Sequence, residues 1–175
     1  WFYGGGAARF FPDVWKRFTE LIPEAEHDDL IAAYHRRLFC GDLMEETRHA
    51  QRWAGWENAL ASMESAGHMG EGSGSYARAF SRIENHYFTN AGFLRQDGQI
   101  LAEMAEIAHI PGTVVQGRYD MICPPEAAHA LCDRWPRGTL RMIPAAGHAL
   151  SEPGISAELV RTTRGIAKAP ELYGI

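Results

Sequence analysis

Residues 111–175 alternate between strand-like and helix-like segments, and this order limits the folds that are open to the chain. The strand-like segments TVVQG (residues 113–117) and TLRMIP (residues 139–144) are short, rich in apolar residues and bounded by Gly or Pro. Each is followed by a loop and a helix-like segment. Two strands separated by a helix predict a parallel pair joined by a crossover helix. The sequence therefore predicts an α/β fold class here, with a buried strand at residues 113–117.

The first half of the chain carries a mostly helical pattern. Its apolar residues recur at spacings of three and four, as in a helix with one buried face. We expect helices over residues 12–22, 27–39, 44–63 and 76–88, and a helix or linker over residues 100–110. These patterns predict a helical domain over residues 1–98 and an α/β domain over residues 99–175.

Composition argues against several classes of partner. The net charge of −5 is unsuited to nucleic acid, which requires a basic surface. No apolar run approaches the roughly 18 residues of a membrane helix, so no membrane partner is expected. The odd number of cysteines, three, predicts reduced thiols and a cytoplasmic location. The eight histidines show no HExxH or other paired spacing, so we infer no metal ion and no other cofactor.

An acid and a histidine follow the two predicted strands. Asp120 lies in GRYDMICPP (residues 117–125), and His148 lies in PAAGHALSEPG (residues 144–154). Because the carboxyl ends of parallel strands meet at one edge of a sheet, we expect these two side chains to meet. The acid would orient the imidazole, and the imidazole would serve as general base for a nucleophile. Taken singly, an Asp in a turn and a His after Gly are usually structural.

Cys123 follows the acid closely and is a second possible nucleophile. A reactive thiol needs a base or a helix N-terminus beside it to lower its pKa. The neighbouring sequence, Cys-Pro-Pro, supplies neither. We therefore interpret Cys123 as a structural or semi-exposed thiol with no base beside it.

Several motifs together resemble the proline iminopeptidases (prolyl aminopeptidases) of the α/β-hydrolase fold. They are GRYDMICPP, PAAGHALSEPG and RIENHYF, and the segments WFYGGGAARFFPDVW, AAYHRRL and RWAGWENA are similar to the helical cap of that family. The resemblance covers residues 1–167 and implies a substrate-selecting cap over residues 1–98. It implies that residues 99–175 are the C-terminal part of the hydrolase core. In that family Asp120 would be the triad acid and His148 the base of a serine peptidase that releases N-terminal proline from peptides.

The serine of that family is not found in the chain. No G-x-S-x-G motif is present, and the nearest match, GEGSGS, has Glu71 and Ser75 two residues to either side of Ser73. The family order implies that the serine and the oxyanion hole lie upstream of Trp1. They would belong to a missing N-terminal half of the hydrolase domain, in the same or another chain. We expect the 175 residues alone to be inactive, because triad members act as a unit.

Two glutamates are candidates for binding the amine of the substrate. The amine of an N-terminal proline is charged, and burying it requires a carboxylate partner. Glu57 and Glu84 each lie among aromatic residues, and the resemblance implies that both bind this amine. It also implies that Phe88 and Tyr3 line the pocket for the pyrrolidine ring. On the alternative interpretation, both glutamates are solvated surface acids and the aromatic residues are core.

Two other functions fit the same residues. The chain could belong to another α/β-hydrolase, such as an esterase or an epoxide hydrolase, and the residue at the nucleophile position would separate these classes: Ser indicates acyl transfer and Asp indicates alkyl-ester chemistry. Alternatively, the chain could be a catalytically dead interaction module. The exposed edge of its sheet would then be available for pairing with another chain.

Overall fold

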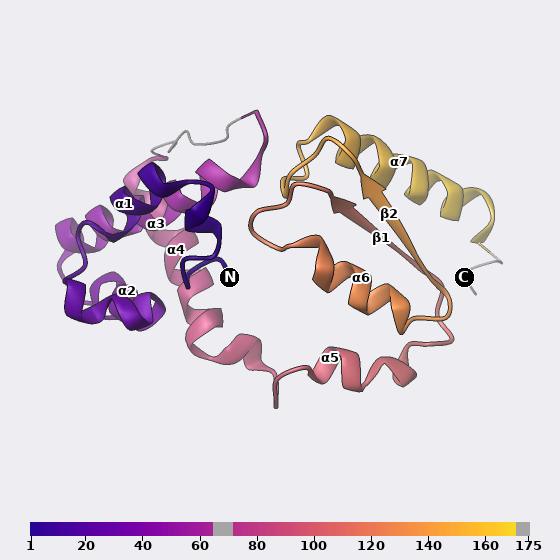
Figure 1. Cartoon of the computed structure of the whole chain (residues 1–175), viewed down its shortest axis with the longest axis horizontal. Coiled ribbons are helices and arrows are strands. Elements are labelled where there is room, and N and C mark those ends of the chain that lie inside the picture. Colours follow the sequence, from indigo (N-terminus) through magenta and orange to yellow (C-terminus); the bar gives the residue numbers. More distant parts are fainter. Residues whose placement is uncertain (65–71, 171–175) are drawn as a thin grey trace. The chain divides into compact units, whose positions relative to one another are not determined.

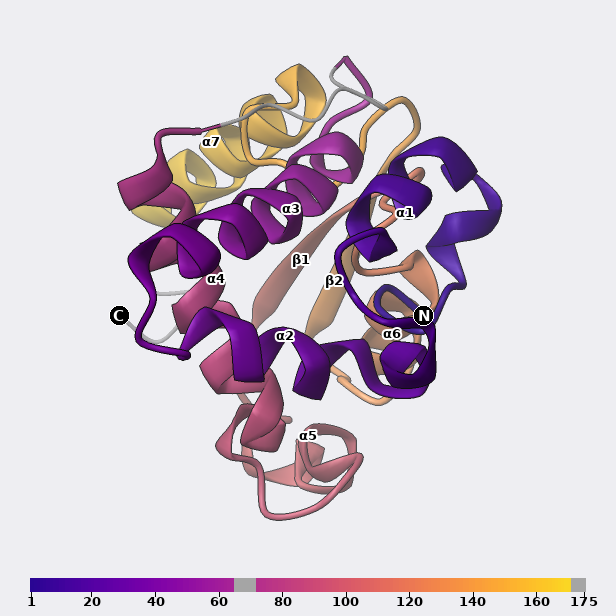
Figure 2. The ribbon, with the colours of Figure 1, turned by 90° about the vertical axis from the view of Figure 1, so that its left-hand side faces the viewer.

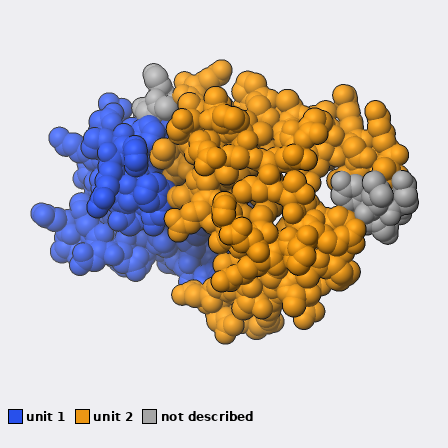
Figure 3. All heavy atoms as spheres, turned by 45° about the vertical axis from the view of Figure 1, so that its right-hand side comes forward, with its two compact units in different colours: residues 1–60, 65–94 blue, residues 61–64, 95–175 orange. Residues whose placement is uncertain are grey.

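The computed structural model describes residues 1–64 and 72–170, and these form two compact units (Figure 3). Of the described residues, unit 1 comprises 1–60 and 72–94, and unit 2 comprises 61–64 and 95–170. Residues 61–64 therefore group with the second unit, although Ala61 is the last residue of a helix whose other residues belong to the first. Gly70 and Glu71 of the GEGSGS segment lie outside the described residues.

Unit 1 is helical (Figures 1 and 2). Its α-helices are α1 (Pro12–Thr19), α2 (Leu30–Leu38), α3 (Leu43–Ala61) and α4 (Gly74–Thr89), and its 3-10 helices are Ala7–Arg9, Glu24–Asp29 and Ala91–Phe93. The single helix expected over residues 27–39 is wrong in its first turn. Those residues form a 3-10 turn, and the α-helix starts at Leu30, where Asp29 caps it by accepting the backbone N–H of Ala32 at 3.0 Å.

Aromatic side chains fill the core of unit 1. Phe18, Tyr34, Trp53 and Trp56 are fully buried, and the rings of Phe18 and Tyr34 stack with their centroids 4.8 Å apart. The hydroxyl of Tyr34 donates to the carbonyl of Phe18, so the burial of this polar tip is compensated. Side chains of this size provide most of the buried apolar surface of a small helical unit.

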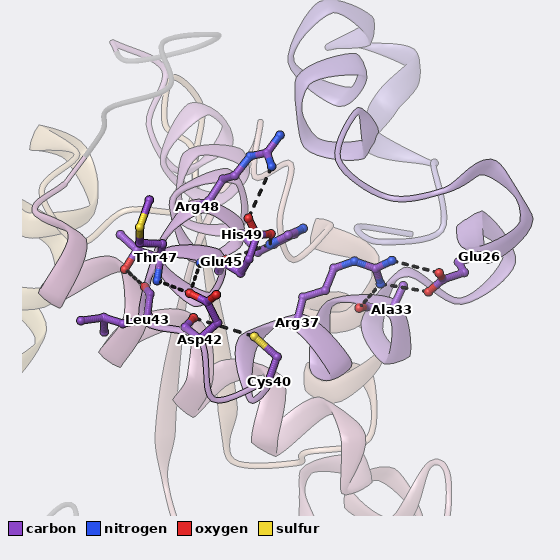
Figure 4. A network of polar contacts seen from close by, with 11 residues as sticks. Glu26, Ala33, Arg37, Cys40, Asp42, Leu43, Glu45, Thr47, Arg48 and His49 are labelled. Carbon is purple, nitrogen blue, oxygen red and sulfur yellow. Dashed lines mark hydrogen bonds and ion pairs between the residues drawn. The ribbon is translucent and has the colours of Figure 1, made fainter.

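Polar contacts hold the 3-10 helix Glu24–Asp29 to α2 and cap the start of α3 (Figure 4). The Arg37 guanidinium donates to both carboxylate oxygens of Glu26, each at 2.9 Å, and to the carbonyl of Ala33. At the start of α3, the carboxylate of Asp42 accepts the backbone N–H of Met44 at 2.8 Å, which supplies an N-terminal cap. The contact of Asp42 fixes the start of the helix that carries Glu57.

Helix α3 has 19 residues, yet its sequence mixes charged and apolar side chains. Ser81 on α4 donates to the carbonyl of Ala50 on α3, and Arg78 on α4 donates to Thr47, so the two helices lie side by side. Across residues 1–64 and 72–170, no helix combines the length and the apolar character that crossing a bilayer requires.

Unit 2 is an α/β unit. Its strands β1 (Gly112–Gly117) and β2 (Gly138–Ile143) are parallel and paired from Gly112 with Gly138 to Gly117 with Ile143. Its helices are α6 (Pro125–Asp133) between the strands, α7 (Pro153–Lys168) after them, and the short α5 (Gln99–Ala102) with a 3-10 helix at Met104–Glu106 before them. Helices α6 and α7 flank the strand pair (Figure 1). The predicted parallel strands with a crossover helix are confirmed.

The prediction that residues 113–117 form a buried strand is wrong. Among the residues of β1, Gly117 is buried and the others are half-buried. A strand of a parallel sheet is fully buried when helices cover both faces and strands lie on both edges. In the described residues the sheet has two strands, so β1 has a neighbour on one edge.

Candidate functional site

Glycine at the end of β1 allows the two strand-end loops to come together. A Cβ on Gly117 would lie 2.0 Å from the carbonyl oxygen of Gly147, so no other residue fits this crossing. Just beyond it, the backbone N–H of Arg118 donates to Ile143 and that of Tyr119 donates to Ala146, both at 2.9 Å. The turn after β1 and the loop after β2 are thus tied together by backbone hydrogen bonds.

Asp120 is the acid of this turn, and its carboxylate is surrounded by donors. It is 6% exposed, and its Oδ1 accepts the backbone N–H groups of Ile122 at 3.0 Å and Cys123 at 2.8 Å. Its Oδ2 accepts the side-chain amide of Gln116 at 3.1 Å and lies 3.0 Å from Nδ1 of His148. The structure therefore brings the predicted acid and histidine together at the carboxyl ends of the two strands.

The pair favours opposite charges. Burial acts to raise the pKa of Asp120, but the hydrogen bond with His148 and the backbone N–H groups outweigh it, so the pKa is lowered. The hydrogen bond to Asp120, followed by that to the Cys123 side chain, raises the pKa of His148 from 6.5 to about 10. With Nδ1 on Asp120, Nε2 is the ring nitrogen that can exchange a proton with a nucleophile.

The prediction that Cys123 has no base beside it is wrong. Its side chain lies close enough to the His148 ring to contribute to the raised pKa of that ring. The contact arises because the turn folds back over Asp120, which brings residues from two separate loops together. Gln116, a further contact of the acid, was not predicted from the sequence. Its one signal is a polar amide at the end of an otherwise apolar strand.

The two glutamates belong to one group of side chains in unit 1. Glu57 on α3 is 6% exposed, and the hydroxyl of Tyr3 donates to its Oε1. Glu84 on α4 is half-buried, and the indole N–H of Trp53 donates to its Oε2 at 2.8 Å. The interpretation of Glu57 as a solvated surface acid is therefore wrong, and Trp53 is both core and a hydrogen-bond donor.

The aromatic rings join the two acids into an acid–aromatic cluster: Tyr3, Trp53, Glu57, Glu84 and Phe88. Tyr3 stacks on Trp53 with centroids 4.4 Å apart and meets Phe88 edge-on at 5.4 Å. Burial, followed by the nearby charges of Glu57 and Glu84, raises the pKa of Tyr3 well above its usual value. The Tyr3 phenol thus lies within electrostatic range of both carboxylates, so the two acids lie around a common aromatic surface.

Two further observations concern a cavity in unit 1 and the possibility of a metal site among the described residues. A cavity of about 330 Å³ lies beside Tyr3, but it is lined by residues 1–4 and 28–31 and not by either glutamate of the cluster. Among residues 1–64 and 72–170, no three His, Cys, Asp or Glu side chains come together as a metal site would require.

Parallel strands with an acid–histidine pair at their carboxyl ends are compatible with part of a hydrolase core of the α/β type. Comparison with curated proteins gives the family. The chain is 42% identical over 169 residues to "Proline iminopeptidase" of Xanthomonas citri, covering 95% of this chain and 54% of that protein. It is 44% identical over 165 residues to the protein of the same name from Arabidopsis thaliana, covering 91% of this chain and 43% of that protein. The chain belongs to the proline iminopeptidase family.

The alignments cover only part of each relative. The chain spans about half the length of the curated relatives that it matches. For the protein of Xylella fastidiosa strain Temecula1, also named "Proline iminopeptidase", the identity is 44% over 155 residues, which are 87% of this chain and 50% of that protein. No family model matches the chain.

Proposed function

We propose that the complete protein is a serine aminopeptidase that releases proline from the amino terminus of peptides. In this proposal residues 99–175 supply the acid Asp120 and the base His148, and residues 1–98 form the cap that selects the substrate. The serine and the oxyanion hole come from residues outside this chain, so the 175 residues alone are inactive. The three free thiols fit a reducing compartment, and we place the enzyme in the cytoplasm.

The observation that carries the proposal is the contact between His148 and Asp120. The 3.0 Å distance from Nδ1 to Oδ2 is that of a base oriented by an acid in a serine hydrolase. Asp120 is held by backbone N–H groups, so it presents Oδ2 to the ring at a fixed angle. The imidazole can then take a proton from a serine hydroxyl through Nε2 and return it to the leaving amine.

The exposure of His148 explains how its pKa would become suitable for a base. A pKa of about 10 keeps the ring protonated at neutral pH, whereas a general base must be neutral. The side chain is 42% exposed in this chain. A nucleophile domain that covered the ring would remove water from it, and desolvation lowers the pKa of a histidine. The pKa of His148 should therefore be lower in the complete protein than in the 175-residue chain.

The acid–aromatic cluster supports the choice of an amino-terminal proline. Two carboxylates near one phenol repel each other when both are ionised, and a cation between them removes that cost. The charged secondary amine of proline supplies one positive charge. The rings of Tyr3 and Phe88, which retain exposed surface, can contact the pyrrolidine ring, and aromatic rings attract an adjacent cation.

The experiment uses the complete protein and two substrates that differ in the amine. We expect Glu84→Gln to lower kcat/KM for a proline arylamide by about 100-fold or more, because a cation in the site loses a charged partner. Hydrolysis of an ester without an amine should change by less than about threefold. The matched control is Glu45→Gln, an exposed glutamate of α3 paired with Arg48, which should affect neither substrate.

Three outcomes would count against the proposal. Equal losses on the arylamide and the ester would remove the amine-binding role of Glu84. An aspartate at the nucleophile position of the complete protein would indicate alkyl-ester chemistry, as in an epoxide hydrolase. Proline release at an enzyme-like rate by the purified 175-residue chain would show that no further residues are needed.

A further inference from the structure

A buried glutamate supports the loop that carries His148. Glu152 is 4% exposed, and its Oε1 accepts two backbone N–H groups, those of Gly147 at 3.2 Å and Met63 at 2.6 Å. The residue stands at the N-cap position of α7, but its side chain makes no capping hydrogen bond to that helix. An acid at this position ordinarily accepts from the first turn of its own helix. Glu152 instead connects the histidine loop with residues 61–64.

Ala61, which groups with unit 2, holds the same loop from a second direction. The carbonyl of Ala61, the last residue of α3, accepts the backbone N–H groups of His148 at 2.9 Å and Ala149 at 2.7 Å. Carbonyls in the last turn of a helix have no partner within the helix, so they are available for such bonds. Ala61, Met63, Gly147, His148 and Glu152 thus form a cluster that we call the loop clamp.

The loop clamp leaves little room for movement. A Cβ on Gly147 would lie 3.2 Å from both the carbonyl of Ala61 and Oε1 of Glu152. A charged carboxylate this deeply buried is unfavourable unless its oxygens are hydrogen-bonded. Two N–H donors and the positive end of the 16-residue helix α7 offset that cost. The compensation depends on the backbone of Gly147 remaining where it is.

We propose that Glu152 is a positioning residue, which fixes the backbone at Gly147 and His148 against Met63 so that the imidazole stays on Asp120. It acts through the loop, because its contacts are with backbone groups and not with the ring. The titratable groups that face the ring are Asp120 and Cys123. The importance of Glu152 for catalysis rests on the proposed function. The position of the His148 ring, however, can be measured independently of activity.

The test measures the pKa of His148 by NMR in the complete protein with ¹³C-labelled histidine, together with the pH profile of kcat/KM. Glu152→Ala releases the loop, so the hydrogen bond to Asp120 weakens and the pKa of His148 falls by about one unit or more. The acidic limb of the pH profile moves by the same amount. Glu152→Gln retains an acceptor oxygen and should keep the pKa within a few tenths of the wild-type value.

Glu46→Ala is the matched control. Glu46 is a 7% exposed glutamate of unit 1 that accepts the backbone N–H of Gly41 at 2.9 Å, and its loss should leave the pKa of His148 unchanged. If Glu152→Ala does not fold, Glu152→Asp, which is too short to reach both donors, serves in its place. An unchanged pKa of His148 in Glu152→Ala or Glu152→Asp, or an equal fall in Glu46→Ala, would overturn the proposal. A shifted pKa in a protein that releases no proline would refute the proposed function alone.

Discussion

Replacing Asp120 by asparagine isolates the charge of the acid–histidine pair. The amide has nearly the same shape as the carboxylate, and its oxygen can still accept the backbone N–H groups of Ile122 and Cys123. What Asp120→Asn removes is the negative charge 3.0 Å from Nδ1 of His148. We expect the pKa of His148 in the 175-residue chain to fall from about 10 towards 6.5, since the hydrogen bond to Asp120 is the largest cause of the rise.

The rise from 6.5 to about 10 sets an upper limit on the energy of the pair. At ~1.4 kcal/mol for each tenfold change in proton affinity, it corresponds to ~5 kcal/mol without solvent screening. The His148 side chain is 42% exposed, and water screens a partly exposed pair strongly. We therefore expect a loss of ~1–2 kcal/mol in the free energy of unfolding on Asp120→Asn.

The loss depends on pH in a defined direction. The pKa of His148 is raised in the folded state, so its contribution is fully present below 6.5, where the unfolded chain is protonated too, provided that Asp120 is ionised. Between 6.5 and about 10 the folded chain keeps a proton that the unfolded chain has lost, and stability decreases as pH rises. The difference between wild type and Asp120→Asn should therefore be largest near pH 5–6 and small above about pH 10.

The assay is an NMR titration of the histidine rings, combined with urea unfolding at several pH values. Asp133→Asn is the matched control, because Asp133 forms a second aspartate–histidine pair with His129 at 3.1 Å, and both side chains are 66% exposed. It should leave the His148 titration unchanged. A His148 pKa that stays near 10 in Asp120→Asn would refute the reasoning, as would a stability difference that does not vary with pH.

Three further variants test individual contacts in the 175-residue chain. Tyr3→Phe keeps the ring stack but removes the donor to the buried Glu57, and should cost about 1–3 kcal/mol in urea unfolding; no loss would show that this hydrogen bond is not formed. Gly117→Ala places a Cβ 2.0 Å from a carbonyl oxygen, so it should displace the His148 loop and lower the pKa of that ring, whereas Gly165→Ala, with open space around it, should not. Cys123→Ala should lower the pKa of His148 by less than Asp120→Asn does, and an unchanged titration would contradict the thiol–imidazole contact.

The parallel strand pair was predictable because local patterns determine it. Short β-branched runs bounded by Gly or Pro and separated by a helix allow few topologies. The burial of β1 was not predictable in the same way, since it depends on how many strands lie beside it. The 3-10 turn before Leu30 also differs from its acidic, helix-like sequence, because the last part of that turn serves as the cap of α2.

Within the candidate site, the sequence indicates residues that lie at strand ends but not the contacts that cross between loops. Asp120 and His148 follow consecutive strands, so their meeting was expected from the topology. The contacts of Cys123 and Glu152 depend on loop conformation, which is set by close approaches at Gly117 and Gly147. No periodic pattern in the sequence reports such approaches.

The most direct measurement of the central claim is the rate at which the complete protein releases proline from a proline arylamide, compared with its His148→Ala and Glu46→Ala variants. The account predicts release by the wild type, a loss of about 1000-fold or more in kcat for His148→Ala, and a rate near that of wild type for Glu46→Ala. A complete protein that releases no proline, or a His148→Ala variant that retains most of the activity, would contradict it.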